Sequence, residues 1–175
     1  MTLTLVLGGA RSGKSAYAQR AAETLAAARR VSPVFIATGE AGDGEMAERI
    51  ARHRADRGDQ WRTVEAPLRL AEALAGLAED EVAVVDCLTL WLSNSMFDEA
   101  GHAVRLAGLV PALAACRAVV WLVSNEVGWG VVPDNALARA FRDQAGRLHQ
   151  DIAAVAGEVV LVVAGLPLTL KPAPP

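Results

Sequence analysis

The sequence predicts an α/β fold, in which a mostly parallel sheet is covered by helices on both faces. Short, continuous apolar runs rich in Val, Leu and Ile are typical of strands that are buried on both faces. Stretches rich in Ala, Arg and Glu, long enough for helices, alternate with these runs. With 175 residues, 53% of them hydrophobic and 21% charged, the chain is expected to form a single domain over residues 1–175.

Five apolar runs are expected to form the strands. They lie at residues 3–7, 34–37, 82–85, 119–123 and 159–164. Helices are expected at residues 13–30, 44–57, 69–78, 104–116 and 135–156. The longest helix repeats apolar residues at helical spacing, and Asp134 or Asn135 can cap its beginning. Pro111 is expected to end or kink the helix around it, and residues 98–101 and 172–175 are expected to be loose.

Composition and charge exclude several classes of function. The formal net charge is −3 and the sequence pI about 5.6, so no nucleic-acid partner bound through bulk positive charge is expected. No apolar run approaches the ~18–20 residues that cross a bilayer, and the chain opens on a strand-like run, so a cytoplasmic protein without a membrane span is expected. Cys87 and Cys116 are too few for a disulfide framework or a thiolate zinc site, and both are expected to be reduced and buried.

The strongest local signal is a glycine-rich loop between the first strand and the first helix. It consists of Gly8, Gly9, Ala10, Arg11, Ser12, Gly13, Lys14 and Ser15, and it fits the pattern G-x-x-x-x-G-K-[S/T]. The backbone N–H groups of such a loop point at phosphate oxygens, and the helix N-terminus adds a favourable dipole. Lys14 then reaches the β- and γ-phosphates, and the Ser15 hydroxyl binds Mg²⁺. A chance match is the alternative, which the strand before the loop and the helix after it disfavour.

The use of lysine supports this interpretation of the loop. Of the 17 basic residues, only Lys14 and Lys171 are lysines. Lysine is therefore retained at the one position where a compact charge on a flexible stem is needed for a phosphate.

A carboxylate follows a second strand. The apolar run 82–85 ends in Asp86, which is expected to hold Mg²⁺ directly or through its water shell. The alternative is a turn residue or a helix cap, since residues 88–97 can form a helix.

A histidine lies among arginines in the second expected helix. On a helix, Met46, Ile50 and His53 share one face. The surrounding positive charge comes from Arg49, Arg52, Arg54 and Arg57. It suits a polyphosphate and favours a neutral imidazole, which can attack phosphorus. The alternative for His53 is a packed histidine on a solvated helix. Of the other two histidines, His102 is expected to be exposed and His149 lies within the long helix. Neither shows the spacing of metal ligands.

The segment after the fourth expected strand contains Asn125, Glu126 and Trp129, together with two glycines. Loops at the carboxyl ends of parallel strands line ligand sites. These residues are a candidate clamp for a large organic substrate, and a structural loop carboxylate is the alternative for Glu126.

Taken together, these motifs resemble those of the bifunctional adenosylcobinamide kinase/adenosylcobinamide-phosphate guanylyltransferase family of cobalamin biosynthesis, over nearly the whole chain. The similar segments beyond the glycine-rich loop are FIAT at 35–38, EM at 45–46, RI at 49–50, HR at 53–54, WRTVE at 61–65, DCLT at 86–89, SNEVG at 124–128, VPDN at 132–135, FRD at 141–143 and AGR at 145–147. The ordered set, above all NEVG followed by VPDN, is more specific than the phosphate loop alone.

The resemblance implies two reactions. In the first, the γ-phosphate of ATP or GTP passes to the aminopropanol hydroxyl of adenosylcobinamide. In the second, GTP gives its GMP to a histidine, here His53, and the phosphorylated cobinamide takes the GMP to form adenosylcobinamide-GDP.

The resemblance also implies the setting of these reactions. The fold is a single P-loop domain with a RecA-like sheet, Mg²⁺ accompanies the nucleotide, and the protein is a homo-oligomer, a homotrimer in its relatives. The nucleotide contacts beyond the loop fall on Thr38, Gly39, Glu40, Arg54, Ala55, Asp56, Arg57, Glu65 and Asp86.

Two other functions are weighed against this one. A small-molecule P-loop kinase would use the same loop and leave His53 a structural role. A GTP-dependent switch is disfavoured, because no Asn-Lys-x-Asp guanine-reading motif is present in the sequence.

Overall fold

The computed structural model describes residues 2–39 and 58–173. The strands in this part of the chain are β1 (Thr2–Gly8), β2 (Val34–Ala37), β3 (Arg62–Glu65), β4 (Val82–Asp86), β5 (Val119–Asn125), β6 (Glu158–Val163) and β7 (Leu166–Lys171). The helices are α1 (Lys14–Arg29), α3 (Leu70–Ala75), α4 (Leu88–Phe97), α5 (Glu99–Ala115) and α6 (Ala136–Val155).

All of these strands belong to one sheet, in the order β3-β2-β4-β5-β1-β6-β7. Neighbouring strands are parallel except β6 and β7, which are antiparallel. The register pairs Gly8 with Asn125, and Ala37 with both Glu65 and Asp86. The carboxyl ends of β1 to β5 therefore meet at one edge, and β5 separates the strand that leads into the glycine-rich loop from the strand that ends in Asp86.

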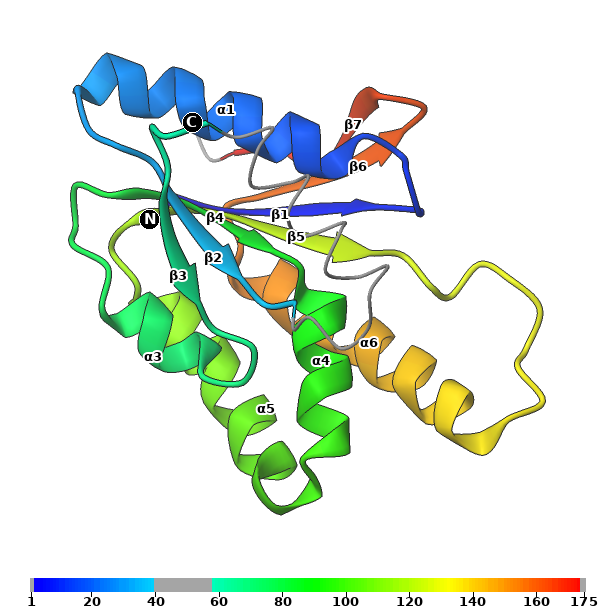
Figure 1. Ribbon diagram of the computed structural model, residues 1–175. Coiled ribbons are helices and arrows are strands. Elements are labelled where there is room, and N and C mark those ends of the chain that lie inside the picture. Colours follow the sequence, from blue (N-terminus) through cyan, green and yellow to red (C-terminus); the bar gives the residue numbers. More distant parts are fainter. Residues whose placement is uncertain (1, 40–57, 174–175) are drawn as a thin grey trace.

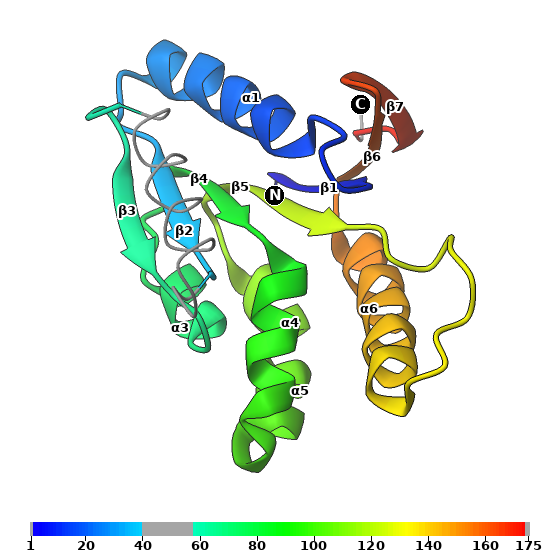
Figure 2. The same ribbon diagram turned by 45° about the vertical axis from the view of Figure 1, so that its right-hand side comes forward.

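Helices cover both faces of the sheet. Figures 1 and 2 show α1 on one face and α3, α4, α5 and α6 on the other. Helix α1 turns a row of small side chains, Ala18, Ala22 and Ala26, toward the sheet, which lets it lie close to the strands. The expected α/β class, with a mostly parallel sheet between helical layers, is confirmed.

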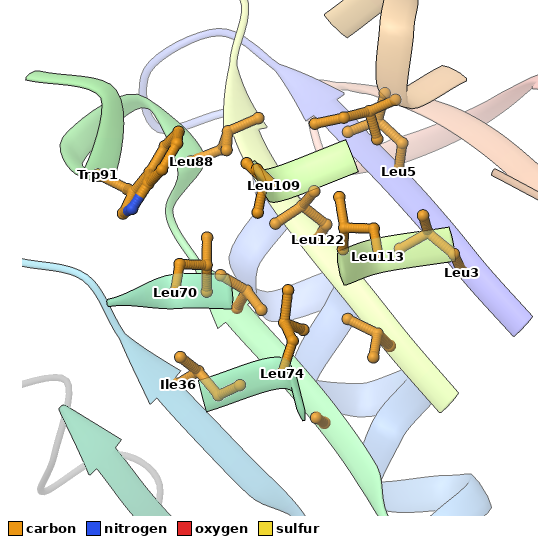
Figure 3. Packing of buried hydrophobic residues seen from close by; sticks show 14 of the residues in the cluster. Leu3, Leu5, Ile36, Leu70, Leu74, Leu88, Trp91, Leu109, Leu113 and Leu122 are labelled. Atoms are coloured by element: carbon orange, nitrogen blue, oxygen red, sulfur yellow. The ribbon is translucent and has the colours of Figure 1, made fainter. Parts of the chain in front are cut away.

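The larger core lies between the sheet and the four helices on its second face. Figure 3 shows leucines from β1, β5, α3 and α5 meeting there, with Ile36 from β2 and Trp91 from α4. A smaller cluster under α1 contains Val6, Val84 and Val123. Successive residues of β4 alternate between the two clusters, which explains why its apolar run is continuous rather than alternating.

The helices differ from expectation in three places. Residues 98–101 are not loose, because α5 begins at Glu99, and the helix does not end at Pro111 but continues to Ala115. Ala107, whose carbonyl would otherwise accept from residue 111, is exposed, so water can satisfy it. Helix α3 is shorter than expected and ends before Gly76.

Two strands were not expected from the sequence. Strand β3 has four residues, three of them exposed, so it lacks the apolar run that marks the inner strands. Strand β7 is an edge strand whose side chains are almost all exposed. Its signal is the dipeptide Ala164-Gly165, which turns with positive φ at both residues between two apolar runs.

The two cysteines are both free, as expected, but only Cys87 is buried, whereas Cys116 is half-buried. Among the helices that the structure describes, none is long and apolar enough to cross a membrane.

Candidate functional site

The glycine-rich loop leaves β1 at its carboxyl end and leads into the first turn of α1. Gly13, the N-cap of α1, has φ of 94°, which favours glycine. Gly8 needs glycine for a different reason: a Cβ there would lie 2.6 Å from the carbonyl oxygen of Val162 on β6 and would also meet the Ser12 side chain. The loop is braced from outside as well, because the Gly165 N–H donates to the Ser12 carbonyl at 2.8 Å.

The side chains of the loop suit an anionic ligand. Lys14 is only 7% exposed, and its ammonium donates to the Gly9 carbonyl at 3.1 Å, which bends the lysine back over the loop. The Ser12 hydroxyl is buried and has no hydrogen-bond partner among the residues that the structure describes. A buried polar atom without a partner is costly, and a phosphate oxygen would satisfy it.

Asp86 ends β4 at the same edge of the sheet. Burial raises the pKa of the neighbouring Cys87 thiol, the Asp86 carboxylate raises it further, and the Lys14 charge lowers it. Lys14 and Asp86 therefore both lie within electrostatic range of one side chain. The alternative role of Asp86 as a helix cap is not supported, since Cys87 is the N-cap of α4 and no side chain caps that helix.

The residues fit a Mg²⁺ ion in their chemistry. Ser15 lies in the first turn of α1, which packs against β4, and Asp86 ends that strand. A hydroxyl and a carboxylate are oxygen donors of the kind that Mg²⁺ takes in combination with substrate phosphates and water. In residues 2–39 and 58–173, no group of three or more His, Cys, Asp or Glu side chains is placed to hold a metal ion.

Thr38 joins the ends of two strands. It is fully buried, its hydroxyl donates to the Cys87 carbonyl at 2.7 Å, and the same hydroxyl accepts from the Cys87 N–H at 2.7 Å. The Thr38 N–H donates to the Asp86 carbonyl at 3.3 Å, and the Asn94 side chain donates to the Thr38 carbonyl at 2.8 Å. Every polar group of Thr38 thus has a partner, and its hydroxyl and N–H hold the backbone of Cys87 and Asp86 in place.

The end of β5 and the segment after it hold the three candidate substrate residues in different settings. The Asn125 amide donates to Thr89 Oγ1 at 2.8 Å and so links β5 to the beginning of α4. Glu126 Oε1 accepts from the Gly128 N–H at 2.9 Å, while Trp129 is 75% exposed. Figures 1 and 2 both show this segment leaving the carboxyl end of β5 and swinging outward before it returns to α6.

Several candidate residues lie outside the described residues. They are Glu40, His53, Arg54, Ala55, Asp56 and Arg57. The chain enters this segment from Gly39, just beyond the carboxyl end of β2. Glu65 is exposed at the end of β3, and the register of β2 places it at the same edge as Asp86.

The other two histidines are not surface residues. His102 was expected to be exposed, but it is half-buried within α5, where Nδ1 lies 3.0 Å from Ser95 Oγ and Nε2 2.7 Å from Gln144 Oε1. His149 is buried and contacts Ser124.

Sequence reasoning missed the supporting residues. Thr89, Asn94 and Ser124 form no local pattern, because Asn125, Thr38 and His149, to which they are bonded, lie 25 or more positions away along the chain. A polar side chain inside an apolar element, such as Ser124 at the end of β5, is the one signal that could have drawn attention to them.

Comparison with known proteins gives a consistent result. Residues 4–170 match the family model described as cobinamide kinase / cobinamide phosphate guanyltransferase. The bifunctional adenosylcobalamin biosynthesis protein CobP of Pseudomonas aeruginosa is 50% identical over 175 residues, which cover 97% of this chain and 98% of the relative. The protein of the same description, CobU, from Escherichia coli is 40% identical over 185 residues, with 97% and 99% covered.

One solved structure is similar in shape at low identity. The KaiC-like protein PH0186 from Pyrococcus horikoshii superposes with a TM-score of 0.49 at 14% identity, and the match covers 91% of this chain and 70% of that one.

Proposed function

This chain belongs to the cobinamide kinase / cobinamide phosphate guanyltransferase family, and we propose that it carries out both reactions on adenosylcobinamide at one shared nucleotide site. The observation that carries the proposal is the phosphate loop itself. Its buried Lys14 and the Asp86 carboxylate both lie within electrostatic range of the Cys87 thiol, and its Ser12 hydroxyl is buried without a partner among the described residues. Each reaction transfers phosphorus from a nucleoside triphosphate, so one loop, one cation and one base pocket can serve both.

The kinase step depends mainly on positioning and charge neutralisation. The loop N–H groups and Lys14 hold the β- and γ-phosphates, so that the aminopropanol hydroxyl can attack the γ-phosphorus in line with the departing nucleoside diphosphate. Mg²⁺ held by Ser15 and Asp86 would neutralise the phosphate oxygens. ATP and GTP both present the triphosphate that the loop recognises.

The guanylyl step uses His53 as the nucleophile. A ring nitrogen attacks the α-phosphorus of GTP, the bond to the β-phosphate oxygen breaks, and pyrophosphate leaves. A phosphate oxygen of adenosylcobinamide phosphate then attacks the same phosphorus, which frees the imidazole and forms adenosylcobinamide-GDP. A neutral imidazole is required for attack, so this step slows in acid.

We assign further nucleotide contacts to both sides of the loop. They are Thr38, Gly39, Glu40, Arg54, Ala55, Asp56, Arg57, Glu65 and Asp86. Thr38 acts through the backbone of Cys87 and Asp86, to which its hydroxyl and its N–H are bonded.

The acceptor side is assigned to the end of β5 and the segment after it, with Asn125, Glu126 and Trp129 as the contacts. The exposed indole of Trp129 offers apolar surface to a corrin ring. This segment ends at Asn135, which lines an apolar pocket of about 320 Å³ between α4 and α6. A pocket of that kind supports an acceptor much larger than a simple alcohol.

We also propose a single-domain, cytoplasmic homo-oligomer, as a trimer. The continuous sheet from Thr2 to Lys171 supports one domain, and a cytoplasmic enzyme has direct access to ATP and GTP. Large apolar side chains that are more than half exposed, such as Val131 and Leu166, support an association between copies. Light scattering of the purified chain measures the number of copies.

The test is a product assay with two labels. Adenosylcobinamide is incubated with γ-labelled ATP, and in parallel adenosylcobinamide phosphate is incubated with α-labelled GTP. We expect label in the corrinoid in both reactions, loss of both with Lys14→Ala, and loss of the second alone with His53→Ala. The alternative, a kinase that lacks guanylyl transfer, predicts label only from ATP in the wild type, and absence of both products would overturn the proposal.

A further inference from the structure

A buried hydrogen bond joins α6 to the end of β5. Ser124 Oγ lies 2.7 Å from His149 Nε2, and the two residues are 0% and 7% exposed. The phosphate loop and the sheet do not need this bond to form, because β1 is already held by β5 and β6 along its length. The effect of the bond is therefore to hold the His149 imidazole ring in one orientation within the core.

The other ring nitrogen faces a carboxylate. His149 Nδ1 lies 3.9 Å from Glu126 Oε2, beyond hydrogen-bond distance but well within electrostatic reach. Burial lowers the pKa of His149, so the ring is neutral near pH 7 and carries one N–H. A carboxylate only accepts, so the favourable tautomer places the proton on Nδ1 and leaves Nε2 to accept from Ser124.

Glu126 is the first residue of the segment that follows β5, and it connects that segment to the phosphate loop. Its N–H donates to the Gly8 carbonyl at 3.0 Å, and its Oε1 accepts from the Gly128 N–H at 2.9 Å. A Cβ at Gly128 would lie 3.1 Å from the same Oε1, so the turn is closed tightly around the carboxylate. The direction in which the segment leaves the loop is thus set by where the Glu126 carboxylate is held.

The order of contacts, serine to histidine to carboxylate, is that of a hydrolytic triad. That chemistry does not apply here, because Ser124 has no exposed surface and no acyl group can reach its hydroxyl. The arrangement holds a carboxylate in place instead.

We propose that His149 is a positioning residue for the acceptor substrate: held by Ser124, it fixes the Glu126 carboxylate and thereby sets the segment 126–135 beside the phosphate loop for a corrinoid. The inference rests on the proposed function for the identity of the acceptor. It assigns His149 no contact with the substrate.

Two conservative variants separate positioning from stability. His149→Gln places its amide near the position of Nε2 and can keep the Ser124 bond, whereas His149→Asn places a donor near the position of Nδ1 and loses Ser124. We expect His149→Gln to raise the KM for adenosylcobinamide by about tenfold, with the KM for ATP and kcat little changed. His149→Asn is expected to keep the acceptor KM near the wild-type value, although it is the less stable variant, because it leaves the Ser124 hydroxyl without a partner.

The order of the two variants in acceptor KM is therefore the opposite of their order in thermal stability. If the acceptor KM rises in step with the loss of thermal stability across the two variants, His149 is only structural and the proposal is wrong. In a Glu126→Gln background, His149→Gln should add less than about twofold to the acceptor KM, since the carboxylate it positions is gone. If the two substitutions instead multiply each other's full effects on the acceptor KM, the proposal is also wrong. The matched control is His102→Gln, at a histidine that also contacts a serine but lies on α5, and it should leave the acceptor KM unchanged.

A spectroscopic arm needs no activity. The Gly128 amide, bonded to the Glu126 carboxylate, gives a ¹H–¹⁵N resonance that should keep its wild-type position in His149→Asn and move in His149→Gln. An unmoved resonance in His149→Gln overturns the proposal. If the wild-type enzyme does not act on adenosylcobinamide but the resonance moves as expected, the result counts against the proposed function and not against the positioning of Glu126.

Discussion

Replacing Thr38 by valine should destabilise the protein through one identifiable backbone group. Valine has nearly the shape of threonine, so the change removes the hydroxyl without opening a cavity. The hydroxyl serves both the carbonyl and the N–H of Cys87. The carbonyl keeps a second donor, the Trp91 N–H at 3.2 Å, so only the Cys87 N–H loses its partner.

The loss of this one hydrogen bond sets the expected loss of stability. A buried donor left without a partner costs about 1–3 kcal/mol, so Thr38→Val should lower the free energy of unfolding by about 2 kcal/mol. For a chain of this length that corresponds to a fall in Tm of about 4–8 °C. The Asp86 carbonyl keeps its bond to the N–H of residue 38, but the Cys87 N–H beside it is left free, so weaker binding of Mg²⁺-GTP should accompany the loss of stability.

The assay is urea unfolding of both proteins, followed by circular dichroism, with Thr63→Val as the matched control. Thr63 is exposed on the edge strand β3, so its change should stay within about 0.5 kcal/mol. If Thr38→Val is as stable as the control variant, the hydroxyl does not hold the strand ends together, and the reasoning about this site fails.

Further predictions concern the loop, the buried histidine and the cation. Gly8→Ala should lower the free energy of unfolding by about 1–3 kcal/mol and weaken GTP binding in equilibrium dialysis, because its Cβ would meet the Val162 carbonyl. Gly9→Ala has open space around its Cβ and should leave the free energy of unfolding near the wild-type value, so equal losses for the two variants in urea unfolding would contradict this. Since burial lowers the pKa of His149 below its ordinary value of 6.5, the unfolded chain takes up a proton first as the pH falls below about 6.5. Stability should therefore decline from there until the pH reaches the lowered pKa, and urea unfolding across pH should show a shallower decline for His149→Gln. Asp86→Asn should weaken the apparent affinity for Mg²⁺ in the kinase assay by at least about tenfold, and an unchanged Mg²⁺ dependence would remove Asp86 from the cation site.

Local chemistry made some parts of this protein predictable. The phosphate loop is contiguous, and the strand and helix that it needs are adjacent in sequence, so Gly13 and Lys14 could be assigned to it from their neighbours in the chain. Asp86 follows a run of four buried residues, and Asn135 accepts from two N–H groups at the beginning of α6 as a cap should.

Features that depend on distant partners were not predictable. The residues around His102 have the composition of a loop, yet its ring contacts Ser95 on α4 and Gln144 on α6 and so packs between those two helices. The short strand β3 is specified by its pairing with β2 rather than by its own residues. Likewise, Ser124 and His149 meet only because the 20 residues of α6 return along the sheet from the outlying segment.

The central claim, that one site transfers GMP through His53, is tested most directly by trapping the intermediate. The wild-type chain is mixed with α-labelled GTP and Mg²⁺, denatured, and exposed in portions to alkali and to acid. A phosphoramidate predicts a protein-bound label that survives alkali and is lost in acid, that maps to the peptide containing His53, and that is absent from His53→Ala while this variant still phosphorylates adenosylcobinamide. No label on the wild-type chain, or an undiminished label on His53→Ala, would contradict the account.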